Sequence, residues 1–446
     1  MMRVRGGGCA ASKPGNQAES FTQDLDGPPR LDFPAEALIA AEPTCDAIGG
    51  GADEADATKA ALLVAASAVR NTTPLELFDN LDLNGWNHYN GKVFEGALTH
   101  DEELGDSAAA LVDARFLIAL AKVKNGRLRR RQDLPPEAFL DLNTIKKLGM
   151  SGGIALRIIA VSHPWQQPDN PDPKGINLRL LARVLEVLIK KWGRTYAVFL
   201  DFMSLHQKDS DGAERPPHHA ALFERALLNM MDWYSHPKVF TLKLTALPEG
   251  YPNDGFFFPE GIVPNTASYF GRGWCFCEST VSNISKSPEL VFDLGKFSGK
   301  STDYNEVFKE CAAHRPPPLM PKSFRVALDE KAFTSKKADI ETVSNLYQQT
   351  FGKQMALAKH LFYSHLQWTD AEMIDLCEVL ASGSAAQVVY LKLDHNSFGD
   401  TGYSALADVI SKGSMPELRT VMLDTAAHPK LKEACLAGGI IIELAR

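Results

Sequence analysis

Apolar and polar positions change their period several times between residues 149 and 315. Short continuous apolar runs, each typical of a strand buried on both faces, lie at 154–161, 196–200, 239–244 and 290–292. Between these runs, apolar residues recur at helical spacing from Leu178 to Trp192 and from Leu222 to Tyr234. Because strands that alternate with helices form parallel βαβ units, the pattern predicts an α/β fold with a parallel sheet covered on both faces.

The starts of the predicted helices carry their own signals. Asn177 is a candidate N-cap of the first helix, and Pro217 is favoured at the start of the second. A third, short helix is expected from about Gly273, after the third strand. These boundaries place each strand end immediately before a loop or a helix start.

The segments on either side of this region have different patterns. Residues 1–55 are rich in Gly, Ala, Pro and Asp and have no lasting apolar period, which predicts a disordered N-terminal tail. Residues 56–148 are expected to form a mostly helical region. Residues 316–358 begin with three prolines, which predict a stiff linker, and continue into a helix.

A gapless repeat of about 30 residues occupies the segment 359–446. The stretch that starts at Asp370 aligns with the one that starts at Asp400, and each predicts a helix, a Gly-Ser turn and a short strand. Asn396 stands where a side chain satisfies backbone groups of the turn, and Ala426 takes its place in the next unit. A partial earlier unit is expected around Leu361.

Composition narrows the functional classes. The chain has 446 residues and a formal net charge of −8, which argues against a general nucleic-acid binder. No run of eighteen apolar residues exists, so no membrane span is expected. Seven scattered cysteines fit a reducing cytoplasm, and the Cys275-x-Cys277 pair lacks the further ligands of a zinc site. The basic cluster at 127–131 is interpreted as a solvated helix end rather than as a binding site for phosphate or an acidic partner.

Polar residues follow three of the predicted strands. Ser162, His163 and Trp165 follow the first strand, the segment 201–207 follows the second, and the segment 274–278 lies on the helix after the third. The carboxyl ends of parallel strands share one edge of a sheet, and open α/β sheets bind ligands at that edge. We therefore expect these segments to converge in space.

These residues resemble two related families. The pattern Val161-Ser162-His163, the strand end at Asp201 and the motif Trp274-Cys275-Phe276-Cys277-Glu278 resemble a Toll/interleukin-1 receptor (TIR) domain. The Asp201-x-x-x-Leu-x-Gln207 run and Arg272-Gly273-Trp274 resemble the fungal heterokaryon-incompatibility (HET) domain. The resemblance covers about 165 of the 446 residues. It implies a flavodoxin-like α/β domain over 149–315, although the loop at 247–270 is long for a TIR domain and Ser204 stands where HET domains usually carry Cys.

Catalytic members of the TIR family cleave NAD between nicotinamide and ribose, and the resemblance assigns the catalytic carboxylate to Glu278. Nicotinamide departs as a neutral molecule and needs no general acid, so one carboxylate can stabilise or capture the ribosyl cation. The candidate substrate-binding residues are Ser162, His163, Trp165, Asp201, Gln207, Arg272 and Trp274. NAD is then a substrate, and we expect neither a cofactor nor a metal.

Other interpretations stay open. Many TIR domains are assembly modules without activity, and Glu278 near a helix start is also favoured by the helix dipole alone. The segment 295–301 has one residue too few between its glycines for a P-loop, and Ser162 lacks the Gly-x-Ser-x-Gly elbow of a hydrolase. The repeats resemble short ribonuclease-inhibitor-type leucine-rich repeats, which implies contacts with protein partners or self-association.

Overall fold

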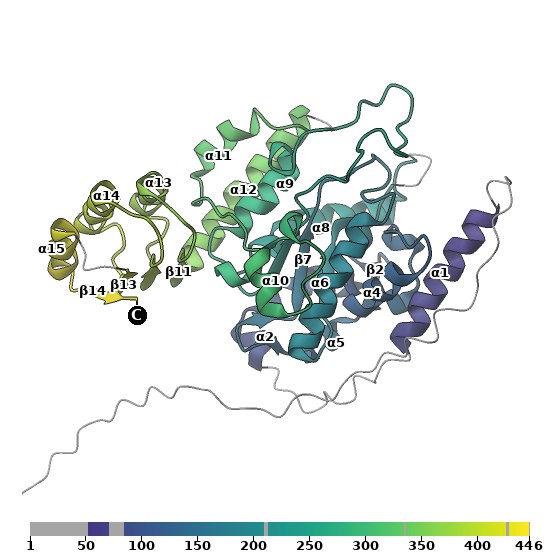
Figure 1. The fold of residues 1–446 in the computed structure, drawn as a ribbon, viewed down its shortest axis with the longest axis horizontal. Coiled ribbons are helices and arrows are strands. Elements are labelled where there is room, and N and C mark those ends of the chain that lie inside the picture. The colour runs from purple at the N-terminus through teal and green to yellow at the C-terminus, as the bar shows by residue number, and fades with distance from the viewer. Residues whose placement is uncertain (1–51, 71–83, 209–212, 334–335, 425–427, 446) are drawn as a thin grey trace, which may run out of the picture. The chain divides into compact units, whose positions relative to one another are not determined.

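A computed structural model describes residues 52–70, 84–208, 213–333, 336–424 and 428–445, drawn in colour in Figure 1. The predicted disordered tail lies outside the described residues except at 52–55, where the first helix begins. Ala426 also lies outside them.

The main sheet has six strands among the described residues, in the order β10-β9-β7-β8-β3-β4. Their bounds are β3 (Leu111–Asp113), β4 (Phe139–Leu140), β7 (Ile158–Ser162), β8 (Ala197–Leu200), β9 (Phe240–Lys243) and β10 (Val291–Asp293). The strands β10, β9, β7 and β8 are mutually parallel, and β3 and β4 extend the β8 edge in antiparallel fashion. Every residue of the four parallel strands is buried, as the continuous apolar runs predicted.

Two separate hydrophobic cores lie on the two faces of this sheet. Ile158 and Ala160 belong to the core that includes residues of α8 (Pro217–Ser235) and α9 (Gly273–Ser282). Ile159 and Val161 belong to the core of α4 (Ala114–Lys122) and α6 (Ile176–Trp192). Successive side chains of a strand face opposite sides, so Ser162 at the end of β7 faces α8 and α9.

Two local predictions differ from the structure. The apolar run at 154–161 is divided at Arg157, whose buried guanidinium donates to the carbonyl oxygens of Met150, Trp192 and Arg194. Its first part forms β6 (Ala155–Leu156), paired with β5 (Met150–Ser151). Asn177 lies inside α6 instead of capping it, because Asp172 accepts hydrogen bonds from the backbone N–H groups of Asn177 and Leu178.

The segment 56–148 contains strands as well as the expected helices. Its other described elements are α1 (Ala52–Arg70), α2 (Asn84–His88), η3 (Gly91–Phe94), α3 (Glu95–Leu98), β1 (His100–Asp101), β2 (Asp106–Ser107), η4 (Arg131–Asp133), η5 (Pro136–Ala138) and α5 (Leu142–Lys147). Because β3 and β4 pair with β8 and with each other, this segment shares the main sheet with the segment that follows.

Several short elements also lie in the connections after β8, β9 and β10. They comprise α7 (Asp201–Ser204), η6 (Tyr269–Gly271), η7 (Pro288–Leu290), η8 (Leu294–Lys296) and α10 (Tyr304–Glu310). No helix in the described ranges has the length and apolar character that crossing a membrane requires.

The C-terminal segment forms a second parallel sheet, in the order β11-β12-β13-β14. Its elements are β11 (His360–Phe362), α13 (Asp370–Ala381), β12 (Tyr390–Lys392), α14 (Asp400–Ser411), β13 (Thr420–Leu423), α15 (Pro429–Ala437) and β14 (Ile441–Leu444). Residues 30 positions apart are register partners across the first three strands, for example Leu361, Leu391 and Val421. The repeat in the sequence is therefore a repeat in space, and the expected earlier unit at Leu361 is present.

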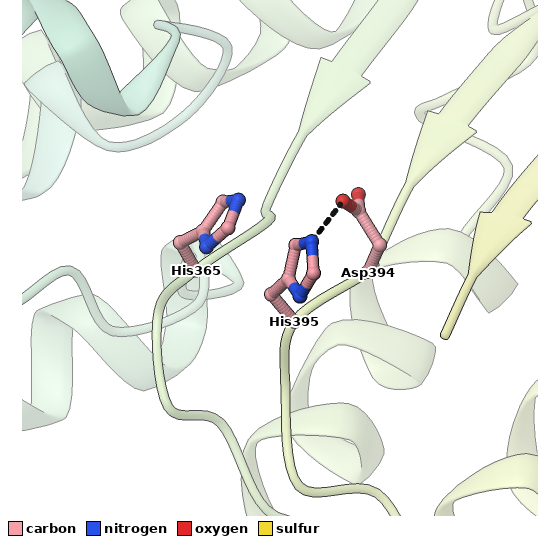
Figure 2. Close-up of side chains that lie close together, drawn as sticks. All are labelled: His365, Asp394 and His395. Carbon is pink, nitrogen blue, oxygen red and sulfur yellow. Dashed lines mark ion pairs between the residues drawn. The ribbon is translucent and has the colours of Figure 1, made fainter. Parts of the chain in front are cut away.

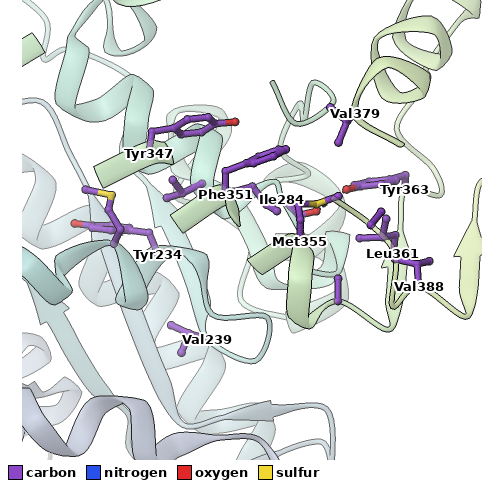
Figure 3. Packing of buried hydrophobic residues seen from close by; sticks show 14 of the residues in the cluster. Tyr234, Val239, Ile284, Tyr347, Phe351, Met355, Leu361, Tyr363, Val379 and Val388 are labelled. Atoms are coloured by element: carbon purple, nitrogen blue, oxygen red, sulfur yellow. Dashed lines mark hydrogen bonds between the residues drawn. The ribbon is translucent and has the colours of Figure 1, made fainter. Parts of the chain in front are cut away.

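Helices α11 (Pro321–Leu328) and α12 (Lys336–Leu357) connect the two sheets. Figure 3 shows Tyr347, Phe351 and Met355 of α12 between Tyr234 of α8 and Leu361 of β11, all in one hydrophobic core. The expected linker helix is thus a buried packing element.

Candidate functional site

The carboxyl edge of the main sheet brings the predicted segments together. Ser162 ends β7 and is the register partner of Lys243 at the end of β9, and Asp201 directly follows β8. Helix α9 packs against β7 and against η6, and it presents Glu278 to Ser162. Residues more than 110 positions apart in the sequence therefore meet at one edge.

The start of α9 depends on Gly273. A β-carbon at this position would lie 1.8 Å from the ring of Phe333, so only glycine allows this close approach. The backbone N–H of Gly273 also donates to the carbonyl of Ala332. Helix α9 begins at Gly273 in this close contact, and Glu278 follows about one and a half turns later.

Glu278 is almost completely enclosed, with 6% of its surface exposed. The hydroxyl of Ser162 donates to its carboxyl group, and Ser162 also bonds the hydroxyl of Tyr269. Burial, and next the negative charge of Asp201, raise the pKa of Glu278 well above its ordinary value, while hydrogen bonds from Ser162 and Tyr234 oppose that rise. The site therefore holds a carboxyl group that favours its neutral form in this enclosed state.

A second polar group surrounds Asp201. Nε2 of His163 lies 2.8 Å from Oδ1 of Asp201, and the indole N–H of Trp165 donates to Oδ2 at 2.9 Å. The backbone N–H of Phe202 also donates to this carboxylate. Burial alone would raise the pKa of Asp201, but His163 and these hydrogen bonds lower it overall. Asp201 is consequently the ionised carboxylate at this edge of the sheet, and Glu278 is the carboxyl group that favours its protonated form.

Two other predicted residues use their polar atoms on the backbone. Arg272 donates to the carbonyl oxygens of Trp165, Asn265 and Ala267. Gln207 donates to the carbonyls of Asp201 and Leu205. Both side chains hold loops in place around the edge, and all three guanidinium nitrogens of Arg272 donate to these carbonyl oxygens.

Trp274 is half-buried against the core on the α9 face. Its neighbour Cys275 donates from Sγ to the carbonyl of His163 at 3.6 Å, which couples α9 to the end of β7. The motif thus contributes core packing through Trp274, a contact with the end of β7 through Cys275, and the carboxyl group of Glu278.

The long loop 247–270 closes the site. Its last turn carries Tyr269, a buried ring whose hydroxyl reaches Ser162 beside Glu278. Arg272 anchors the loop at Asn265 and Ala267, and Tyr251 donates to the carbonyl of Asn265 at 3.1 Å. With 6% of its surface exposed, Glu278 offers a substrate little direct access in this structure.

Three residues of the site were missed by the sequence analysis. Tyr234 and Tyr269 were assigned to helix packing or to the loop, yet both face Glu278. Lys243 is 1% exposed and donates to Oγ of Ser279 at 3.3 Å, and burial lowers its pKa to about 7. A lysine at the end of an otherwise apolar strand was the one available signal for it.

A cavity of about 830 Å³ lies elsewhere, between the segment 98–143 and the residues after β8. Asp106 lines it, 2.7 Å from Nη2 of Arg131 and 3.2 Å from Nε2 of His206, whose ring stacks on His219. Burial opposes the shift, but His206 and Arg131 lower the pKa of Asp106 to about 2. The interpretation of the basic cluster as solvated was wrong for Arg131, because its guanidinium is buried on Asp106 and on the carbonyls of Ala108 and Ser204.

Comparisons of the chain with protein-family models, with curated proteins and with solved structures found no match. The resemblance to TIR and HET domains therefore rests on the motif residues themselves. Their placement at one sheet edge, with Glu278 against Ser162, is the observation from which a function is argued.

Proposed function

We propose that the chain is a TIR-like or HET-like signalling protein that cleaves NAD at the nicotinamide–ribose bond, with Glu278 as the catalytic carboxylate. The observation that carries this proposal is the position of Glu278 against Ser162 at the carboxyl end of β7. The parallel strands in chain order have the arrangement 2-1-3-4, as in flavodoxin-like folds, whose ligand site lies between the first and third strands. Glu278 is positioned beside that point.

Cleavage of the nicotinamide–ribose bond requires one ionised carboxylate close to the anomeric carbon of the ribose. As the bond to nicotinamide breaks, the ring nitrogen takes the bonding electron pair and becomes neutral, while positive charge develops on the ribose. The carboxylate of Glu278 stabilises or captures that charge, and water completes the hydrolysis. Ser162 orients the carboxyl group, and Tyr234 lies beside it while its hydroxyl donates to the carbonyl of Val161. The rings of Trp165 and Trp274 supply stacking surfaces near the edge.

The enclosed geometry defines a resting state in this proposal. Burial favours the neutral acid of Glu278, whereas the reaction needs the anion. Movement of the Tyr269 segment would admit water and substrate together, and hydration would stabilise the charged form. Activity would then depend on whatever displaces this segment, including assembly with a partner.

A second candidate is a non-catalytic assembly scaffold with the same fold. It is favoured by the closure of the site, because Tyr269 and the anchored loop leave Glu278 buried. In both candidates we propose that the C-terminal array is a short leucine-rich repeat region that contacts protein partners. Asn396 supports this proposal, because its side chain forms hydrogen bonds with backbone groups of two successive turns and so joins neighbouring repeat units.

We propose that the protein acts in the cytoplasm. The five described cysteines are free and buried, which suits a reducing compartment. The net charge of −8 makes protein partners a better expectation than nucleic acid.

The test is nicotinamide release from NAD by the full chain at high protein concentration. We expect release by the wild type, release by Glu260→Gln, and background only from Glu278→Gln. Glu260 is a matched control because it is an exposed glutamate of the covering loop. Equal release from wild type and Glu278→Gln would remove Glu278 from the chemistry, and no release from any folded variant would favour the scaffold.

A further inference from the structure

Two successive turns of the C-terminal array bring His365, Asp394 and His395 together (Figure 2). Their possible ligand atoms all lie within 4.8 Å of one another. The two imidazole rings stack with centroids 4.0 Å apart and planes 24° apart. Within the parts of the chain that the structure describes, no other group of three His, Cys, Asp or Glu residues meets this distance.

We propose that His365, His395 and Asp394 bind one divalent transition-metal ion of the zinc class, with Asp424 orienting His395. This site is independent of NAD cleavage and was not anticipated from the sequence, which gave no expectation of a metal. Two imidazoles and a carboxylate are the protein ligand set of many zinc sites that keep a further position open. The site lies where the strands β11 and β12 end.

The distances around His395 fit a shared ion better than a direct hydrogen bond. Nε2 of His395 lies 3.6 Å from Oδ2 of Asp394, too far for a hydrogen bond. Two ligands of a tetrahedral zinc ion, each about 2.0–2.1 Å from the metal, are roughly 3.3 Å apart. This pair of atoms therefore needs only a small adjustment to accommodate the ion, whereas the ring of His365, which stacks on His395, has to turn so that its nitrogen points at the same ion.

Asp424 supplies the support that metal-binding histidines usually have. Its Oδ1 lies 3.2 Å from Nδ1 of His395. An N–H at Nδ1 directed to this carboxylate leaves the lone pair of Nε2 free on the side of Asp394. A carboxylate–histidine–metal arrangement of this kind fixes both the tautomer and the ring orientation.

Asp394 provides an independent observation that points to a cation ligand. The residue is 3% exposed, and its Oδ1 accepts no hydrogen bond from any described residue. The ammonium of Lys392 is 3.7 Å from that oxygen, beyond hydrogen-bond distance. A buried carboxylate oxygen left without a donor is costly, and a divalent ion held by both oxygens of Asp394 removes that cost.

The backbone places the two histidines identically. His365 and His395 are 30 residues apart and have φ angles of 57° and 55°, in the left-handed region that residues other than glycine rarely occupy. The backbone N–H of His365 donates to the carbonyl of Asp394 at 3.1 Å, which joins the two turns. The repeat thereby builds a paired site from one position of two units.

The test is titration of the full chain with Zn²⁺, followed by calorimetry, and with Co²⁺, followed by its visible absorption. We expect one ion per chain at this site, lost in His365→Gln and His395→Gln and weakened about tenfold or more in Asp424→Asn. His360→Gln is the matched control, since His360 is exposed at the opposite end of β11 and should bind as the wild type does. The Co²⁺ spectrum should lack the thiolate charge-transfer band that cysteine ligands give.

Several results would overturn the site. The first is no Zn²⁺ binding by the wild type, and the second is unchanged binding by the double variant His365→Gln/His395→Gln. The third is an equal loss of binding in His360→Gln, which would mean that Zn²⁺ binds surface histidines in general. Lys392→Met keeps the test decisive if a histidine variant fails to fold. Removing this competing cation should tighten Zn²⁺ binding, and equal or weaker binding would contradict the proposal.

Discussion

At the scale of single residues, Glu278 and Asp201 are two carboxyl groups of one sheet edge with opposite environments. Asp201 has donors on both oxygens, and its pKa is lowered. Glu278 is enclosed with hydroxyl groups and a like charge nearby, and its pKa is raised. Neighbouring carboxyl groups whose pKa values are shifted in opposite directions are common in active sites, where one group must stay charged and the other must change its charge.

The raised pKa of Glu278 predicts a pH-dependent stability. Between the unfolded pKa and the folded pKa, folding must take up a proton, so the free energy of unfolding falls as pH rises. Glu278→Gln removes this linkage and should be more stable than wild type at pH 8, by about 1 kcal/mol or more, with little advantage near pH 4.5. Urea denaturation at both pH values measures it, with Glu260→Gln as the control. A difference that does not vary with pH would contradict the assignment.

Lys243 predicts the opposite pH dependence, a free energy of unfolding that rises with pH. Burial lowers its pKa to about 7, so below that pH the folded chain carries a buried charge, and the cost vanishes as pH rises toward 10.5. Lys243→Met should exceed wild type in stability at pH 7 by about 2 kcal/mol or more. The gain should shrink by pH 9.5, whereas Lys190→Met on the exposed face of α6 should show no such change. Thermal unfolding at the two pH values decides the matter.

At the scale of elements, the turn after β12 depends on Asn396. Its side chain donates to the carbonyls of Tyr363 and Leu393 and accepts from the backbone N–H groups of Leu366 and Trp368. Asn396→Ala should lower the free energy of unfolding by about 2 kcal/mol or more, because several backbone groups lose their partner. Asn143→Ala, at an exposed position of α5, should change it little. If the two variants lower the free energy of unfolding equally in chemical denaturation, the hydrogen bonds of Asn396 do not stabilise the fold.

Elements with a strong burial pattern could be predicted from the sequence, and weak ones could not. The parallel strands stand out because both of their faces are covered, which leaves continuous apolar runs. The strands β3 and β4 have three and two residues, and Leu111 merges with the helical spacing of α4. Such short strands are specified by their neighbours in the sheet, which the local pattern does not contain.

The candidate site shows the same division. The strand ends at Ser162 and Asp201 predicted the edge where polar residues meet, and Glu278 follows from its motif. The contact of Tyr269 with Ser162 joins positions 107 apart and has no local signature. The enclosure of Glu278 is therefore a property of tertiary packing, and it changes the chemistry expected from the motif alone.

At the scale of the whole molecule, α12 links the two sheets through one hydrophobic core. Met355 is fully buried between them, and Leu357 on the same helix is 62% exposed. Met355→Ala should cost about 2–5 kcal/mol and lower amide protection in both β7 and β12, whereas Leu357→Ala should do neither. If hydrogen exchange in Met355→Ala shows lower amide protection in one sheet only, the two sheets unfold independently.

The central claim is that Glu278 is a catalytic carboxylate held beneath Tyr269. The most direct measurement is nicotinamide release from NAD by folded Tyr269→Ala, beside Tyr269→Ala/Glu278→Gln and the neighbouring exposed-position control Phe270→Ala. Opening the enclosure should raise release about tenfold or more over wild type, which corresponds to about 1.4 kcal/mol of barrier. The double variant should return to background, and Phe270→Ala should match wild type. Release by folded Tyr269→Ala that does not exceed that of the double variant would contradict the account.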